Sequence, residues 1–330
     1  MNRRVTLASR PNGMPKESDF AVEEAEEPQA GPGEVVVRNR FLSVDPYQRG
    51  RMSEARSYAQ PVQIGDVMTS QSVGEVAQSN DPRFAEGDWV VGQTGWQELA
   101  AARAGTLRKI DPKLAPPTTA LHVLGATGLT AYFGLFDIGE PVPGDTVVVS
   151  AAAGAVGQVV GQLAKIAGCR AVGIAGGEEK KRYLLDDFGY DVAIDYKSED
   201  VAAALKDACA GGVNVYFDNV GGEISDAVHR RLATHARIAV CGQISQYNNA
   251  EPELAPRTTR LLIVYRARME GFLISDYAHR FGEALPRLVG WLRDGKLRYR
   301  EDVVQGLENA PRAFIGMLNG ANRGKAIVAV

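Results

Sequence analysis

The chain has 330 residues, of which 45% are hydrophobic, and carries 37 basic against 40 acidic side chains, a formal net charge of −3. This length allows two domains and a large core, and the near-neutral charge gives no indication of a nucleic-acid or membrane partner. No segment reaches the roughly 18 unbroken apolar residues of a membrane span, and the first residues lack the apolar run of a signal peptide. We therefore expect a cytoplasmic protein.

Cysteine and histidine are few and scattered. The cysteines are Cys169, Cys209 and Cys241, so neither a disulfide framework nor a closely spaced zinc site is expected. We interpret all four histidines as structural or solvated, namely His122, His229, His235 and His279. The G-x-S-x-G and H-E-x-x-H motifs are absent, which argues against a hydrolase or a metalloprotease.

The N-terminal third has the pattern of a small β domain. Four prolines between positions 11 and 32 block long helices, and short β-like runs follow at 34–38, 72–76, 88–91 and 96–99, with Gly, Pro and Asp turns between them. Short strands at close spacing predict a compact barrel-like domain.

After residues 116–125 the pattern changes to alternating strands and helices. Nearly all-apolar strands are expected at 146–149, 171–175, 191–195, 213–218, 237–241 and 270–274, with helices at 178–188, 199–210 and 224–233. This alternation predicts an α/β fold, a doubly wound parallel sheet covered on both faces.

The C-terminal part is expected to return to the first domain. We predict an amphipathic helix over 277–294 that Pro286 kinks or breaks, then a helix at 311–318 and a strand at 324–330. The predicted division is therefore residues 1–122 with 298–330 as one domain, and 123–297 as the other.

The most informative stretch runs from Thr146 to Gly168. A buried strand leads through a turn of small residues, 151–157, into a helix, which is the opening unit of a dinucleotide-binding fold. Gly154 and Gly157 let a pyrophosphate approach the backbone at the helix N-terminus, while Ala152 stands where G-x-G-x-x-G has its first glycine.

The end of the second strand indicates which dinucleotide binds. An NAD site has an acidic residue there to bind the ribose 2′-OH, whereas this chain has Gly176-Gly177. Lys180, beside Lys181 and Arg182, and the hydroxyl of Tyr196 could instead bind a 2′-phosphate, which favours NADP. The alternative is that these cations are a solvated helix face paired with Glu178 and Glu179.

With this fold in view, the chain resembles the medium-chain dehydrogenase/reductase superfamily. It is most similar to the zinc-independent branch of prostaglandin reductases, plant alkenal double-bond reductases and bacterial NADPH-dependent curcumin reductases. The matching motifs span nearly the whole chain: Asn2-Arg3-Arg4, Leu7 to Pro11, Leu42 to Tyr47, Arg49 to Ser53, Gly128 to Tyr132, the glycine turn, Phe217 to Gly222, Arg268 to Phe272 and Gly306 to Pro311.

The resemblance implies a GroES-like β-barrel as the first domain and NADPH as the cofactor. The cofactor-binding residues that it implies are Gly154, Ala155, Val156, Gly157, Gly176, Lys180, Tyr196, Asn219, Cys241, Gly242, Ile244, Ser245, Tyr247, Phe272, Leu273, Ile274 and Asn322. One departure is that Gly125-Ala126-Thr127-Gly128 replaces the family's Gly-Met-Pro-Gly, so the contacts of that methionine cannot be carried over.

The resemblance also implies the chemistry, which is hydride delivery to the β-carbon of an α,β-unsaturated ketone or aldehyde, followed by protonation of the enolate. Tyr265 is the implied catalytic tyrosine, and the alternative is that it only packs in the cleft wall. Tyr47 is a second catalytic candidate and, with Met52, an expected substrate contact; the alternative for both is core or rim packing. No metal is expected.

Two other functions stay open on this fold. One is an NADPH quinone oxidoreductase, and the other is an NADPH-binding protein without turnover. A zinc alcohol dehydrogenase is disfavoured because residues 1–116 contain no cysteine or histidine ligand. The resemblance further implies a homodimer, formed through an edge strand near Met269 to Ile274.

Overall fold

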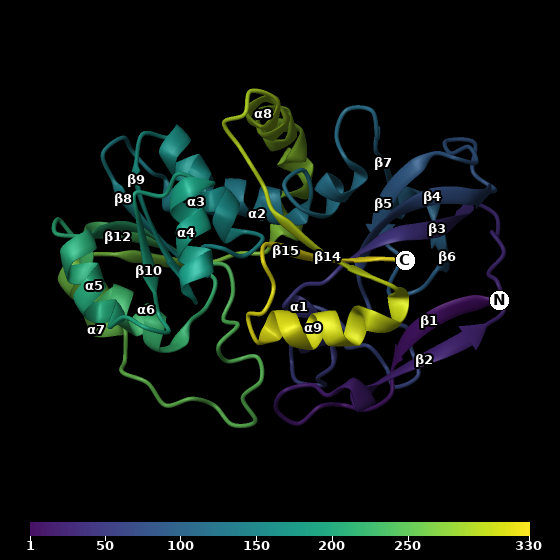
Figure 1. Cartoon of the computed structure of the whole chain (residues 1–330), viewed down its shortest axis with the longest axis horizontal. Helices are drawn as coiled ribbons and strands as arrows, with labels where there is room; N and C mark the ends of the chain where they lie inside the picture. The colour runs from purple at the N-terminus through teal and green to yellow at the C-terminus, as the bar shows by residue number, and fades with distance from the viewer. The chain divides into compact units, whose positions relative to one another are not determined.

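The computed structural model describes all 330 residues, and the chain divides into two compact units (Figure 1). Unit 1 comprises Met1–His122 and Glu301–Val330, and unit 2 comprises Val123–Arg300. The second division thus falls after Arg300, whereas the sequence pattern places it after Leu297. No helix is long and apolar enough to cross a bilayer.

Arg298 and Arg300 belong to unit 2 because helix α3 (Gly157–Ile166) binds their backbone. The amide of Gln162 donates to the Arg298 carbonyl at 2.9 Å and accepts from its N–H at 2.7 Å. Gln158, one turn earlier, does the same with Arg300 at 3.3 and 2.7 Å. Each buried amide both donates and accepts, as a neighbouring strand would, so this segment is held on unit 2.

Unit 2 is built on a six-stranded sheet in the order β10-β9-β8-β11-β12-β13, and every neighbouring pair is parallel. This order is that of a dinucleotide-binding sheet, so the predicted doubly wound fold is confirmed. The strands are β8 (Thr146–Ser150), β9 (Arg170–Ala175), β10 (Val192–Asp195), β11 (Val213–Asp218), β12 (Leu232–Val240) and β13 (Arg268–Gly271).

Helices cover both faces of this sheet. Val147 and Val149 face a core completed by α2, α3, α4 and α8, whereas Val148 faces a core completed by α5, α6 and α7. Alternate residues of one strand therefore serve opposite cores. Besides α3, the helices are α2 (Ala126–Phe133), α4 (Glu178–Asp186), α5 (Val201–Ala208), α6 (Gly222–His229), α7 (Thr259–Tyr265) and α8 (Phe281–Arg293), with a π-helical segment η4 (Gly134–Gly139) after α2.

Two expectations for unit 2 need correction. The last helix does not break at Pro286, because α8 continues through it to Arg293 and the preceding residues Ile274–Arg280 form the 3-10 segment η5. The sixth strand ends at Gly271 rather than Ile274, because the ring of Phe272 turns into the core against Phe217.

Unit 1 contains a seven-stranded, mostly antiparallel sheet in the order β14-β15-β3-β4-β5-β7, with β6 paired to β3. The C-terminal strand β15 pairs with β3, so the two sequence segments of unit 1 share one sheet. Its strands are β3 (Glu34–Ser43), β4 (Gln71–Ser79), β5 (Trp89–Gln93), β6 (Leu99–Arg103), β7 (Arg108–Lys109), β14 (Glu301–Gln305) and β15 (Lys325–Ala329); β1 (Asn2–Leu7) and β2 (Phe20–Ala25) form a separate pair.

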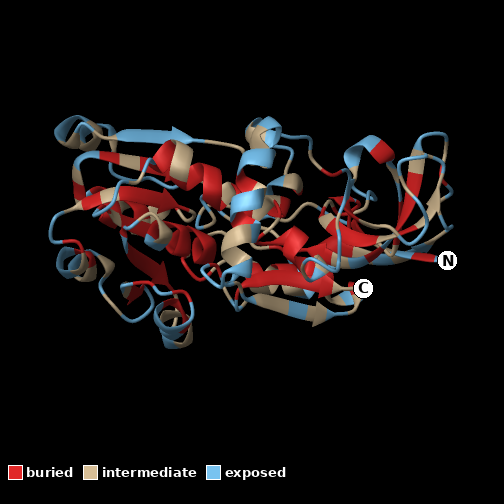
Figure 2. Cartoon of the chain, turned by 90° about the horizontal axis from the view of Figure 1, so that it is seen from above, coloured by how far each residue is buried: buried red, intermediate tan, exposed pale blue.

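One strand of unit 1 is shorter than the sequence predicts. The strand expected at 96–99 begins only at Leu99, and Trp96 before it is fully buried. Figure 2 shows buried residues concentrated in the sheet strands, while the outward helical faces are exposed. The helical segments are η1 (Glu17–Asp19), α1 (Tyr47–Arg51), η2 (Ala104–Thr106), η3 (Pro117–Leu121), η6 (Leu307–Asn309) and α9 (Ala310–Leu318).

His229, at the end of α6, is buried in unit 2 without a hydrogen bond to either ring nitrogen. Its ring meets the edge of Tyr216 with centroids 5.9 Å apart. Burial lowers the pKa of His229, and the carboxylates of Asp218 and Asp226 oppose this shift only in part. The folded protein therefore holds His229 neutral more strongly than the unfolded chain does.

We predict that His229→Phe reduces the loss of stability in mild acid. Because the folded pKa lies below the unfolded value of about 6.5, stability is complete above that pH and declines as the pH falls below it. Thermal unfolding followed between pH 7.5 and 5 should show a shallower decline for the variant. Exposed His279→Gln is the control with the wild-type slope, and parallel slopes for His229→Phe and wild type would contradict the prediction.

Candidate functional site

The carboxyl ends of the parallel strands in unit 2 bring together the loops that the sequence singles out. The turn 151–156 follows β8, Gly176-Gly177 follows β9, Tyr196 follows β10 and Asn219 follows β11. The loop 241–247 follows β12. Because all these strands are parallel, their carboxyl ends share one edge, where doubly wound folds bind their ligands.

The glycine turn leaves no room for a side chain at Gly157 and little room at Gly154. A Cβ on Gly157 would lie 2.4 Å from the carbonyl oxygen of Ala151, and one on Gly154 would lie 3.1 Å from the same oxygen. Ala152 replaces the first glycine of the motif, and its methyl group fits because Gly173 stands opposite on β9; a Cβ there would come within 2.9 Å of it. The departure from the motif is therefore matched by a second glycine.

Tyr190 holds the start of helix α3, and sequence reasoning did not find it. Its hydroxyl donates to the carbonyl of Gly157 at 2.7 Å. Its ring fills the space that a side chain on Gly161 would need, since a Cβ there would lie 2.0 Å from the ring. No side chain caps the helix, and the positive end of its dipole faces the glycine turn. The signal in the sequence was the pair Gly161 and Gly173, both of which face Tyr190.

The turn after β9 is fixed by a carboxylate from the next strand. Gly177, with φ of 98°, donates its N–H to Asp195 at 2.7 Å. Burial alone raises the pKa of Asp195, but hydrogen bonds from the Gly177 N–H and the Ser198 hydroxyl outweigh it, so the pKa of Asp195 is lowered. Gly176 lies under the ring of Tyr196, where a Cβ would approach within 2.8 Å. The Asp195 carboxylate thus serves the turn itself.

The three cations that follow this turn, Lys180 to Arg182, differ in their surroundings. Lys181 pairs with Glu199 at 2.7 Å, so its partner is not Glu178 or Glu179. Arg182 is exposed. Lys180 is half-buried in the first turn of α4, three residues after Gly177. Of the three, Lys180 is therefore the one placed to meet a group bound over Gly176-Gly177.

Asn219 is positioned by a buried polar network around Asp218. The Asp218 carboxylate accepts hydrogen bonds from Tyr216 at 2.9 Å, Ser150 at 3.1 Å and Ser225 at 2.6 Å, and from the backbone N–H groups of residues 220 and 221. Asn219 donates its own N–H to the Ser150 hydroxyl and its amide to the Ser150 carbonyl. Strands β8 and β11 are thereby joined at their carboxyl ends.

The loop after β12 lies on this network. The N–H groups of Cys241 and Gly242 donate to the Asp218 carbonyl at 2.8 and 3.1 Å. Burial, with a smaller contribution from Asp218, raises the pKa of Cys241 to about 12, so its thiol stays neutral. The hydroxyl of Tyr247 accepts from the Gln243 N–H at 3.2 Å, and the Ser245 hydroxyl donates to the Val220 carbonyl at 2.7 Å. Ile244 is half-buried in the same loop.

Tyr265 lies at the opposite edge of the sheet, which corrects its expected catalytic position. Helix α7 ends at Tyr265, just before β13 begins, and the tyrosine hydroxyl donates to the carbonyl of Arg230, just before β12 begins. The amino ends of parallel strands lie away from their carboxyl ends, so Tyr265 is not among the residues that the site gathers. Tyr247, expected only as a cofactor contact, is the tyrosine of the loop after β12.

Phe272 to Ile274 follow β13, and the ring of Phe272 does not point into the site. It packs between Phe217 and Tyr277, with centroids 6.3 Å apart in each case, and a Cβ on Gly134 would meet it at 2.5 Å. Its backbone remains at the carboxyl edge, and Leu273 is half-buried there. The predicted cofactor contact of residues 272–274 therefore stays a prediction, and for Phe272 it falls on the backbone rather than on the ring.

In unit 1, Tyr47 begins helix α1, and burial together with the nearby Asp45 carboxylate raises the pKa of its hydroxyl. Met52 is fully buried, which favours the packing alternative over substrate contact. Asn322 donates to the carbonyl of Gly324 at 2.6 Å and lines a hollow that includes Asp302 and Met317.

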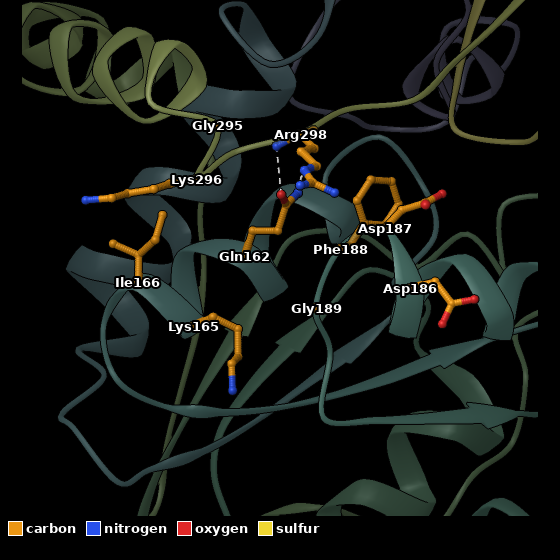
Figure 3. Close-up of a pocket in the computed structure, with 10 residues that line it drawn as sticks. All are labelled: Gln162, Lys165, Ile166, Asp186, Asp187, Phe188, Gly189, Gly295, Lys296 and Arg298. Carbon is orange, nitrogen blue, oxygen red and sulfur yellow. Dashed lines mark hydrogen bonds between the residues drawn. The ribbon is translucent and has the colours of Figure 1, made fainter.

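A separate surface pocket of unit 2 holds none of the predicted site residues (Figure 3). It lies against the C-terminal half of α3, where Gln162 binds the backbone of Arg298, and Lys165 and Asp186 also line it. The glycine turn is at the other end of that helix. No group of three or more His, Cys, Asp or Glu side chains in the structure could hold a metal ion.

Comparisons with known proteins identify similar oxidoreductases. Residues 3–110 match the family described as "N-terminal domain of oxidoreductase", and residues 155–290 match "Zinc-binding dehydrogenase". The NADPH-dependent curcumin reductase of Escherichia coli is 45% identical over 334 residues, which cover 100% of this chain and 97% of the relative. The NADP(+)-dependent 2-alkenal reductase of Nicotiana tabacum is 44% identical over 335 residues, covering 100% and 97%.

Solved structures give the same result. CurA from Vibrio vulnificus in complex with NADPH superimposes with a TM-score of 0.96 at 47% identity, covering 99% of each chain. The prediction of family from the sequence is thus confirmed, because similarity at this level extends over both units. The chain belongs to the medium-chain dehydrogenase/reductase family.

Proposed function

We propose that this protein uses NADPH to reduce the C=C bond of α,β-unsaturated ketones and aldehydes, as the names of its curcumin and alkenal reductase relatives suggest. The observation that carries the proposal is the turn after β9, where Gly176-Gly177 replaces the acid of an NAD site and Lys180 follows. When bound, NADPH would supply the hydride that goes to the β-carbon.

The residues present fit this cofactor. The glycine turn, where a Cβ on Gly157 would strike the Ala151 carbonyl, provides the close backbone approach that a pyrophosphate needs. Lys180 and the hydroxyl of Tyr196 would hold the 2′-phosphate. Asn219, fixed through Ser150, and the loop 241–247 would hold the remaining part of the cofactor.

Tyrosine hydroxyls would stabilise the charge that develops on the substrate oxygen. Because its pKa is raised by burial and by Asp45, Tyr47 stays protonated at neutral pH and can donate a hydrogen bond to an enolate oxygen. Tyr247, at the carboxyl edge of unit 2, is the second hydroxyl that we assign to this task. We assign no role in turnover to Tyr265. The reaction would need no zinc, since residues 1–116 supply no cysteine or histidine ligand.

An electron-acceptor panel tests this function. Purified protein is mixed with NADPH or NADH and with enones, quinones and alcohols, while the absorbance at 340 nm is followed. We expect NADPH consumption with enones. Activity with quinones alone would establish the quinone reductase alternative, and binding of NADPH without consumption would establish a non-catalytic protein.

Removing the two hydroxyls should slow turnover. We expect Tyr47→Phe and Tyr247→Phe each to lower kcat for an enone by about 100- to 1000-fold, the effect of losing an oxyanion donor. In Tyr47→Phe the KM for NADPH should change little, because Tyr47 is not a cofactor residue. Tyr265→Phe is the matched control, since its hydroxyl bonds Arg230 at the other edge. Wild-type kcat in both Tyr47→Phe and Tyr247→Phe would exclude these roles.

Lys180→Met should weaken the binding of NADPH but not the binding of NADH. Loss of a charge-assisted hydrogen bond, worth about 1.5–3 kcal/mol, predicts a KM for NADPH raised by about tenfold or more, while the KM for NADH hardly changes. Arg182→Met, exposed in the same helix, is the control. An unchanged KM for NADPH, or a wild-type preference for NADH, would remove the 2′-phosphate assignment.

We also propose a homodimer formed through β13. All four residues of this edge strand are exposed and its outer edge is unpaired, while Ile263 and Val264 of α7 are 78% and 52% exposed nearby in sequence. An unprotected edge beside apolar side chains can pair with a second copy.

Light scattering should give a mass near twice 35.4 kDa for the wild type. Met269→Lys places a charge on the edge strand and should yield monomers, because pairing would bury that charge. Val289→Lys, on exposed helix α8, should remain dimeric. A wild-type protein that is monomeric at micromolar concentration would refute the dimer.

A further inference from the structure

We propose that Lys325, which five residues follow in the sequence, is a positioning residue that fixes the position of Tyr47 through Asp45. The proposal rests on the proposed role of Tyr47 in turnover. It starts from a charge in an unusual location: the Lys325 side chain opens strand β15 and is only 1% exposed. Lysine is almost never fully buried unless it is paired.

The buried ammonium group acts on one short segment. Its Nζ donates to the carbonyl of Val44 at 2.8 Å and to the Asp45 carboxylate at 2.8 Å. Residues 44–46 connect β3 to α1, and Tyr47 is the first residue of α1. Both bonds therefore fix the backbone directly before Tyr47.

Neutral groups hold the same segment from the other side. The Ser43 hydroxyl donates to the second oxygen of Asp45, and the Asp45 N–H donates to the amide of Gln48 at 2.9 Å. Gln48, fully buried, donates in turn to the carbonyls of Ser43 at 3.2 Å and Thr69 at 2.8 Å. Within this network Lys325 is the only cation and the only member from the C-terminal strand.

Stability alone does not account for a lysine here. Taking an ammonium and a carboxylate out of water is costly, and an apolar residue of similar volume is often as stable or more so. The ion pair fixes the orientation of the Asp45 carboxylate, because this carboxylate is held between Lys325 and Ser43. That carboxylate also acts on the hydroxyl of Tyr47, so its position affects both where Tyr47 lies and how firmly it keeps its proton.

A second acid lies next to Lys325 and provides the matched control. Glu301 on β14 is the strand partner of Lys325 and its side chain is 13% exposed. It precedes no site residue, so Glu301→Gln should leave kcat unchanged, whereas Asp45→Asn should lower it. If the lysine served only to neutralise buried acids, the two substitutions would have similar effects.

The test is a double-mutant cycle in the full-length protein, with 4-phenyl-3-buten-2-one and NADPH as substrates. We expect Lys325→Met to lower kcat by about tenfold or more, because misplacement by about 1 Å can cost on the order of 100-fold, with little change in the KM for NADPH. Lys325→Arg should recover part of the loss. In a Tyr47→Phe background, Lys325→Met should cause no further decrease beyond about twofold, because residues that act as a unit are not additive.

Thermal unfolding is measured for every variant, and Arg40→Met, which removes the surface pair with Glu75, is the control for loss of an ion pair in unit 1. If Lys325→Met does not fold, Asp45→Asn takes its place in the cycle. Unchanged kcat in the folded variant, or a loss that multiplies with that of Tyr47→Phe, overturns the role of Lys325 alone. Wild-type kcat in Tyr47→Phe overturns the proposed role of Tyr47 and, with it, this inference.

Discussion

The close approach of helix α3 to strands β8 and β9 is the constraint on which the candidate site depends. Gly157, Gly161 and Gly173 each lie where a Cβ would collide with backbone or with the ring of Tyr190. A single methyl group there would push the helix away from the sheet, and its N-terminal N–H groups would move with it. The glycines are therefore a packing requirement first, and anion binding at the helix end is a consequence of that packing.

At the turn after β9, the choice between a ribose 2′-hydroxyl and a 2′-phosphate depends on where the nearby acids and cations lie and what they bind. Asp195 lies beside this turn at the end of the neighbouring strand β10, and its carboxylate accepts hydrogen bonds from Gly177 and Ser198, which commits it to the fold. Lys181 is likewise committed to Glu199. A preference for a phosphate over a hydroxyl is thus favoured by the position of Lys180, half-buried in the first turn of α4, rather than by a count of charged residues.

The sequence predicts the sheet well because its strands are apolar on both faces, and it predicts the glycine turn because close packing demands small residues. It does not predict which edge of the sheet a helical tyrosine reaches. Tyr265 lies at the amino ends of the strands, where it bonds Arg230, rather than at the carboxyl ends, while Phe272 turns inward because Gly134 leaves space for its ring. Contacts of this kind depend on helix length and on the partner residue, neither of which a local pattern contains.

Both units use the same device to fix a residue proposed to act on the ligand: a hydrogen-bonded carboxylate at or just after the end of a strand. Asp218 precedes Asn219 and is satisfied by neutral donors, since the backbone turns back to offer two N–H groups beside three hydroxyls. Asp45 stands two residues before Tyr47, where the chain enters a helix and offers no such N–H groups to the carboxylate. The Asp45 carboxylate accepts a hydrogen bond from one hydroxyl, that of Ser43, and the buried ammonium group of Lys325 donates a hydrogen bond to its other oxygen. The need for Lys325 therefore follows from the direction in which the backbone leaves the strand.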